Sequence, residues 1–292
     1  MPDSLLAHPG TAGGRPTSYV VRLYRLVRLL LHIAWGCFYV GVLFPFLSKR
    51  RRLRAIRRFS RQLLSVLQVH SAVRGAIPPG PEPTLLVANH VSWLDIWVID
   101  AVIPVRFVAK ADVRRWPVLG FLVSRSGTIF IEREKRHDAA RTNRAIVEAL
   151  TRGEHVALFP EGTTTDGTEV KPYHASLFQP ALGAGARVVV LALRYLNQDG
   201  SVNVDASYAG DRSMLESLRL ILARRRLRVE VIFAGTVDVH NKTRRDIARE
   251  AESITADALR LPRPGRRLGT AGGPQGVPPK AHAPTHSLYP AR

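Results

Sequence analysis

A histidine and an aspartate stand five positions apart in the segment 89–95 (NHVSWLD), and both are residue types used in general acid–base chemistry. The preceding residues 84–88 (TLLVA) are short, continuous and apolar, which predicts a buried strand. Ser92, with an acid three positions later, predicts a helix N-cap. Because five helical residues rotate by about 500°, His90 can reach Asp95 only from the loop, with Asp95 in the first helical turn. In that arrangement the carboxylate fixes the tautomer of the imidazole, which can act as a general base.

Two other apolar runs also end in polar or glycine residues. The run 127–133 (GTIFIER) ends in Arg133, and the run 159–164 (FPEGTT) carries Glu161. Sites in open α/β sheets form beyond the carboxyl ends of strands, so we expect these segments to converge on His90. Each also has a plainer interpretation. The histidine and aspartate pair occurs by chance, Arg133 could pair with acids at the surface, and Glu161 could belong to an ordinary turn.

Strand-like and helix-like segments alternate from about residue 84 onward, which predicts an α/β fold with a mostly parallel sheet flanked by helices. The expected strands are 84–89, 105–109, 128–132, 155–159, 187–194 and 227–234. The expected helices are 92–102, 115–125, 137–151, 174–183, 211–223 and 242–260.

The chain of 292 residues has a formal net charge of +20, and this charge lies in its flanks. No acidic residue occurs between Asp3 and Glu82, where there are 13 Lys and Arg, whereas residues 82–262 hold 25 basic and 22 acidic residues. A nearly neutral core argues against a basic nucleic-acid groove, and we expect no nucleic-acid partner.

The 20 residues 29–48 carry no formal charge and are flanked by arginines and a lysine, so they are long enough to cross a bilayer as a helix. A cleavable signal peptide is disfavoured because the run starts late and lacks a small-residue cleavage site. Two membrane arrangements remain open, a single span and a helical hairpin in one leaflet whose arginines meet anionic headgroups. A buried soluble helix is the plainer interpretation.

These patterns predict four regions: a disordered N-terminus (1–17), a basic, apolar membrane-attachment segment (18–80), a catalytic domain (81–262) and a disordered basic tail (263–292). Cys37 is the single cysteine, which excludes an intramolecular disulfide. The histidines are scattered, so we expect no metal site.

Four blocks of the chain resemble those of the glycerolipid acyltransferase family, whose members acylate glycerol-3-phosphate, lysophosphatidate and other lysolipids. They are NHVSWLD (89–95), GTIFIER (127–133), FPEGTT (159–164) and, loosely, ARVVVLALRY (186–195). The resemblance covers about residues 80–240. It implies a glycerol-3-phosphate acyltransferase-like fold and an O-acyltransferase of phospholipid biosynthesis. The co-substrate would be an acyl-CoA or acyl carrier protein thioester, with no cofactor.

The resemblance also implies roles for individual residues. His90 would be the general base and Asp95 would orient it, while Arg133 matches the family's headgroup-binding arginine. A thioester is already activated, so no serine acyl-enzyme is needed. The remaining substrate-binding candidates are Glu161, Gly162 and Thr163, with Lys110 and Gly127.

The acceptor is the open question. 1-Acyl-sn-glycerol-3-phosphate is the commonest family substrate, but Thr164 stands where such members typically have an arginine suited to a terminal phosphate. Residues 163–178 are similar to the lyso-ornithine lipid acyltransferase branch. We expect a lysolipid acceptor, an anionic membrane surface as partner and a location at the cytoplasmic face of a bacterial inner membrane. The rival functions are a non-catalytic membrane-binding protein, a nucleic-acid binder and a hydrolase that uses His90.

Overall fold

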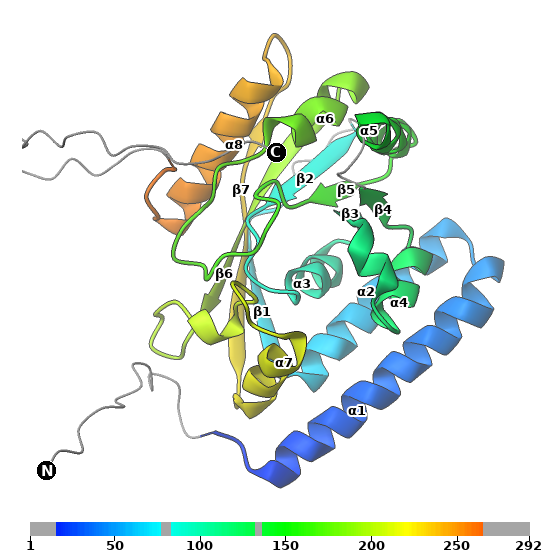
Figure 1. Cartoon of the computed structure of the whole chain (residues 1–292), viewed down its shortest axis with the longest axis vertical. Coiled ribbons are helices and arrows are strands. Elements are labelled where there is room, and N and C mark those ends of the chain that lie inside the picture. The colour runs from blue at the N-terminus through cyan, green and yellow to red at the C-terminus, as the bar shows by residue number, and fades with distance from the viewer. Residues whose placement is uncertain (1–15, 77–82, 132–135, 265–292) are drawn as a thin grey trace, which may run out of the picture.

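Residues 16–76, 83–131 and 136–264 are described by a computed structural model of the chain. Their strands are β1 Val69–Arg74, β2 Thr84–Ala88, β3 Arg106–Lys110, β4 Ile129–Ile131, β5 Val156–Leu158, β6 Arg187–Leu196 and β7 Leu227–Val237. The strands form one sheet in the order β1-β7-β6-β2-β5-β3-β4, and helices cover both of its faces (Figure 1). Neighbouring strands are parallel except β6 and β7. The predicted mostly parallel α/β sheet is confirmed.

From residue 92 onward the helices follow the predicted ones with shifted ends, whereas a further helix lies at Lys49–Val66, in a segment for which no helix was predicted. The α-helices are α1 Tyr19–Phe38, α2 Lys49–Val66, α3 Asp95–Val102, α4 Leu119–Arg125, α5 Arg136–Thr151, α6 Gln179–Ala184, α7 Met214–Ala223 and α8 Arg244–Leu259. Shorter helical turns are η1 Tyr39–Leu43, η2 Phe44–Phe46, η3 Ala111–Arg115, η4 Ala175–Phe178 and η5 Val204–Ala206.

The central strand β2 shows why the sheet is covered on both faces. Leu86 and Ala88 pack into the apolar layer formed with α2, α3 and α7. Leu85 and Val87 pack into the opposite layer, with α5, α6 and α8. Successive side chains of a strand point to opposite faces, so the continuous apolar run seen in the sequence is the pattern of a strand buried on both sides.

Strand β1 lies within residues 18–80, for which the sequence predicts no strand. It pairs in parallel with β7 at the edge of the sheet, and only Val69 of its six residues is buried. A strand so exposed lacks the apolar run or strict alternation that signals a strand. The predicted boundary at residue 81 therefore stays a prediction. The terminal regions 1–17 and 263–292 fall almost wholly outside the described residues.

The N-terminal apolar segment forms a helical hairpin with α2 (Figure 1). The run Tyr19–Phe46 is long and apolar enough to cross a membrane by length and composition, and 17% of its most apolar window is buried. Gly36 permits a close approach between α1 and α2, because a Cβ atom there would lie 2.5 Å from the ring of Phe59. Helix α2 packs in turn against α3.

Candidate active site

His90 lies on the loop between β2 and α3, and Asp95 is the first residue of α3. The Nδ1 atom of His90 lies 2.8 Å from Oδ2 of Asp95, whose side chain is fully buried. The structure therefore brings the predicted pair together in the predicted arrangement. With Nδ1 facing the carboxylate, Nε2 of the ring is the nitrogen left for a substrate.

The predicted helix N-cap at Ser92 is wrong. Helix α3 begins at Asp95 with Leu94 at the N-cap position, three residues later than predicted. Part of a capping arrangement is still present, because the Ser92 hydroxyl accepts the N–H of Leu94 at 3.4 Å and the Asp95 side chain accepts the N–H groups of Val91 and Ser92 at 2.8 and 2.9 Å. These bonds hold residues 91–92 in a loop rather than in a helical turn.

Tyr195, at the end of β6, completes the surroundings of the aspartate. Its hydroxyl donates to Oδ1 of Asp95 at 2.7 Å. Burial raises the pKa of the Tyr195 hydroxyl well above its usual range, so the group stays protonated as a donor. Sequence reasoning missed this residue as a functional one. The available signal was its place in the fourth block, ARVVVLALRY (186–195).

The loop that carries His90 is fixed on several sides. The Asn89 side chain bonds the backbone N–H and carbonyl of Leu193, at 2.7 and 3.0 Å, which ties the end of β2 to β6. The N–H of Thr165 donates to the His90 carbonyl at 2.8 Å. The ring of Phe159 stacks on the imidazole with centroids 3.9 Å apart. The ring is thus held in one orientation by packing as well as by Asp95.

Glu161 supports the same loop from below the surface. One of its carboxyl oxygens, Oε1, accepts the backbone N–H of His90 at 3.2 Å, and the residue is 3% exposed. The other oxygen is buried without a hydrogen-bond partner among the described residues. Burial raises the pKa of Glu161 to about 8, so the carboxyl is mostly uncharged at neutral pH.

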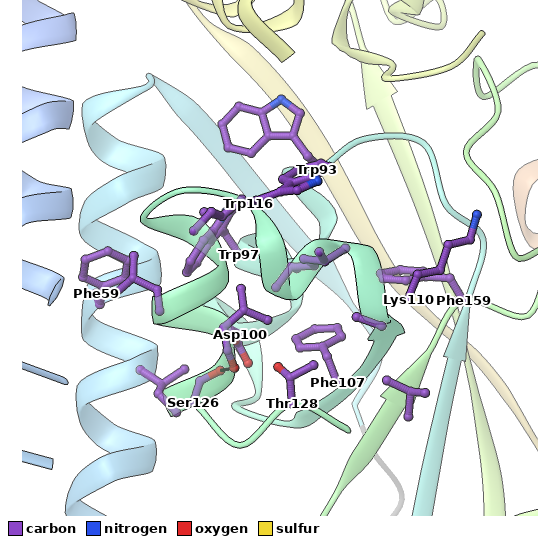
Figure 2. A pocket seen from close by; sticks show the side chains of 18 of the residues that line it. Phe59, Trp93, Trp97, Asp100, Phe107, Lys110, Trp116, Ser126, Thr128 and Phe159 are labelled. Carbon is purple, nitrogen blue, oxygen red and sulfur yellow. Dashed lines mark hydrogen bonds between the residues drawn. The ribbon is translucent and has the colours of Figure 1, made fainter. Parts of the chain in front are cut away.

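A cavity of about 650 Å³ opens beside His90 and extends toward α2 and η1 (Figure 2). Three of the predicted substrate-binding residues, Lys110, Gly162 and Thr163, line it. Most of its lining is aromatic or aliphatic, including Phe59, Trp93, Ile96, Trp97, Phe107, Trp116, Leu119, Leu122 and Phe159. Its shape and lining are those of a binding site for a long apolar group.

The other predicted substrate-binding residues are placed differently. Glu161 and Gly127 are not among the described residues that line the cavity. The carbonyl of Gly127 accepts a hydrogen bond from Nε of Arg106. Arg133 lies outside the described residues, just beyond β4. Thr164 lines the cavity, and its hydroxyl donates to the backbone carbonyl of Tyr208.

In the described part of the chain, no group of three or more His, Cys, Asp or Glu side chains could hold a metal ion. The described site offers an imidazole oriented by a buried carboxyl group beside a mostly apolar cavity.

Comparisons with known proteins match the chain along most of its length. The family model described as Acyltransferase matches residues 70–194. The 1-acyl-sn-glycerol-3-phosphate acyltransferase of Neisseria meningitidis serogroup B is 37% identical over 231 residues, which are 76% of this chain and 86% of the relative. The lyso-ornithine lipid O-acyltransferase of Pseudomonas aeruginosa is 36% identical over 208 residues, which are 71% of this chain and 79% of that relative.

A solved structure supports the fold. The crystal structure of the 1-acyl-sn-glycerophosphate (LPA) acyltransferase from Thermotoga maritima superposes with a TM-score of 0.59 at 20% identity. The match covers 82% of this chain and 96% of the other.

Proposed function

This chain belongs to the acyltransferase family, and from that membership we propose that it transfers a fatty acyl group from a thioester donor to the hydroxyl of a lysolipid. The donor would be acyl-CoA or acyl carrier protein. The observation that carries the proposal is the buried Asp95 holding His90 beside a large apolar cavity.

In the proposed reaction, Nε2 of His90 takes the proton from the acceptor hydroxyl. The resulting oxygen nucleophile attacks the thioester carbonyl, the carbon–sulfur bond breaks, and the thiolate leaves and takes up a proton. Asp95 holds the ring through Nδ1 and stabilises the imidazolium that forms. The hydrogen bonds from Val91, Ser92 and Tyr195 fix the position of this carboxyl group.

The cavity supports the assignment of the acyl site. Most of its lining residues are aromatic or aliphatic, as a fatty acyl chain requires, and many of them come from α3, α4 and the N-terminal hairpin. Gly162 and Thr163 follow Glu161, which accepts the N–H of His90, and they also line the cavity, so the acceptor headgroup would approach there.

1-Acyl-sn-glycerol-3-phosphate is our first candidate for the acceptor, as in the Neisseria relative. A lyso-ornithine lipid is the second candidate, favoured by one observation. Thr164 stands where an arginine would serve a terminal phosphate, and its hydroxyl is engaged by the backbone of Tyr208.

We also propose that the N-terminal hairpin attaches the enzyme to the cytoplasmic face of the membrane. Helix α1 exposes a row of large apolar side chains, and the first turns of α2 expose arginines. An exposed apolar face next to basic residues is the pattern of a helix that lies in an anionic interface. The apolar residues are Tyr19, Val20, Leu23, Tyr24, Val27, Leu30, Leu31, Trp35 and Phe38.

The test supplies labelled acyl-CoA or acyl carrier protein to membranes containing the enzyme, with a panel of lysolipids. We expect wild type to acylate at least one lysolipid and His90→Ala to lose turnover while it stays bound to membranes. If no acceptor is acylated above the level of His90→Ala, the proposal fails. Release of free fatty acid without acylated product would instead identify a hydrolase.

A further inference from the structure

The polar side chains that line the cavity include a cluster of three: Asp100 on α3, Ser126 at the end of α4 and Thr128 at the start of β4. They lie together between Phe59 and Phe107, apart from the His90 side of the cavity marked by Phe159 (Figure 2). The acyl-transfer chemistry proposed above uses none of the three.

The polar groups of this cluster have hydrogen-bonding capacity to spare. Asp100 is 5% exposed, and the one hydrogen bond found for it among the described residues joins Oδ1 to the N–H of Val105 at 3.1 Å. The Ser126 hydroxyl donates to the Val123 carbonyl at 2.7 Å, which leaves its oxygen able to accept. Among the described residues no partner is found for the hydroxyl of Thr128.

Arg58 and Lys110 line the same cavity, but among the described residues neither forms an ion pair with Asp100. Burial raises the pKa of Asp100 to about 8, so at neutral pH it is mostly the uncharged acid, which can both donate and accept a hydrogen bond.

We propose that Asp100, Ser126 and Thr128 form a polar subsite that selects a transferred acyl chain bearing a hydroxyl group in its alkyl portion. The inference rests on the proposed acyl-transfer function, because it assigns the specificity of the same cavity. An unsubstituted chain would lie against these groups and leave their spare donors and acceptors without partners, which disfavours its binding. A hydroxyl supplies both a donor and an acceptor at that point.

The size of the effect follows from the cost of one unmade buried hydrogen bond, which corresponds to about a tenfold change in transfer rate. The competing explanation is purely structural. Asp100 would then serve only to hold the turn at Val105, and the cluster would bind water in place of a substrate group.

The experiment is a competition between thioesters of equal chain length. Hexadecanoyl-CoA is mixed with hydroxyhexadecanoyl-CoA carrying the hydroxyl near the thioester, in mid-chain or at the far end. The acceptor is 1-acyl-sn-glycerol-3-phosphate, or lyso-ornithine lipid in a parallel arm, and the two ester products are counted by mass spectrometry.

Four variants accompany wild type. Thr128→Val removes a hydroxyl at nearly constant volume, and Asp100→Leu removes the acid. Asp100→Asn keeps an acceptor for the N–H of Val105 and presents an amide NH2 group as the donor. Thr142→Val removes a buried hydroxyl on α5, away from the cavity, as the matched control.

We expect wild type, Asp100→Asn and Thr142→Val to prefer one hydroxylated chain by about tenfold, and Thr128→Val and Asp100→Leu to lose that preference. If Asp100→Leu fails to fold, Thr128→Val alone tests whether the cluster selects a hydroxylated chain. Transfer of hexadecanoyl with no preference for any hydroxylated chain, or an unchanged preference in Thr128→Val, would overturn the subsite but leave the acyl-transfer proposal standing. Absence of product from every thioester would overturn both.

Discussion

Asp95 accepts hydrogen bonds from several directions and has no exposed surface. Oδ2 is approached by Nδ1 of His90 and by the N–H groups of Val91 and Ser92, while Oδ1 accepts from the hydroxyl of Tyr195. A carboxyl group bound in this way cannot rotate without breaking several bonds at once. The orientation of the His90 ring is therefore fixed before substrate arrives, which is the condition for efficient general-base catalysis.

Tyr195→Phe tests that fixation at the residue scale. We expect kcat to fall about tenfold with little change in KM, because one buried hydrogen bond to Asp95 is lost and no substrate contact is touched. Steady-state rates with one acceptor measure this. Tyr173→Phe is the matched control, since its buried hydroxyl bonds Thr255 instead. Equal losses in kcat from the two variants would contradict a positioning role for Tyr195.

Glu161 predicts a pH dependence of stability. Its pKa in the folded state, about 8, lies above the ordinary value of 4.5, so the folded protein keeps the proton longer than the unfolded chain does. The stabilising contribution is complete below about pH 4.5 and is lost as the pH rises toward 8. We expect Glu161→Gln to reduce this decline in melting temperature.

Melting temperatures measured between pH 4.5 and 8 in one detergent test the Glu161 prediction. The raised pKa of Asp100 also lowers the melting temperature as the pH rises, so Glu161→Gln should keep part of this decline. The control is Glu148→Gln, whose side chain is 68% exposed on α5. If the melting temperature of Glu161→Gln falls with pH as steeply as that of wild type, the Glu161 carboxyl is ionised in the folded protein.

Helices and strands were predicted mainly from continuous apolar runs and from the spacing of residues close in the sequence. Strands β2 and β6 were predictable because a strand buried on both faces is a continuous apolar run. The meeting of His90 and Asp95 followed from a strand end and a helix start five residues apart. Strand β1 was not predictable, because it is held by the ladder with β7 rather than by apolar side chains of its own.

Other parts of the site depend on contacts across the sheet. Tyr195 reaches Asp95 over 100 positions of sequence, and Glu161 turns inward to the backbone of His90. The spacing of neighbouring residues in the sequence does not predict where the side chain of Tyr195 or Glu161 points. The start of α3 was predicted too early because an acid that bonds the N–H groups of residues 91–92, as Asp95 does, has the same sequence spacing as an acid in the first turn of a helix.

Gly36→Ala tests the packing between α1 and α2. The new methyl group would lie 2.5 Å from the ring of Phe59, so the two helices must separate or the ring must move into the cavity. We expect a loss of about 1–3 kcal/mol in the free energy of unfolding, together with slower transfer of long chains. Urea unfolding and rates across chain lengths measure the two effects.

The control for that packing is Gly41→Ala, where the nearest atom to a new Cβ, in Phe121, lies at an ordinary 3.4 Å. We expect it to leave both measurements close to wild type. If Gly36→Ala also leaves both measurements close to wild type, there is room beside Phe59 for the added methyl group.

At the scale of the whole molecule, the exposed apolar side chains gather on α1. The triple variant Leu23→Asn, Leu30→Asn, Leu31→Asn removes three of them, which are 58–65% exposed. We expect it to release the protein from vesicles containing anionic lipid, because burial of apolar area contributes most of the interfacial binding. Flotation with vesicles is the measurement.

The matched control for α1 changes Val73, Val204 and Leu215 to Asn. These side chains are 45–56% exposed but lie elsewhere on the molecule. We expect this variant to float with the vesicles as wild type does. Equal release of both triple variants would mean that general surface apolarity, rather than α1, holds the protein on the bilayer.

The packing of α2 against α3 limits how this chain could be shortened. Phe59 and Gln62 of α2 line the cavity, and Trp97 on α3 lies 5.5 Å, between ring centroids, from Phe59. A chain that began after α2 would lack one wall of the cavity and would expose Trp97 and its neighbours to water. Cutting away the hydrophobic N-terminus to obtain a freely soluble catalyst would therefore remove part of the catalyst. If the N-terminal hairpin attaches the protein to the membrane as proposed, its removal would end attachment and catalysis together.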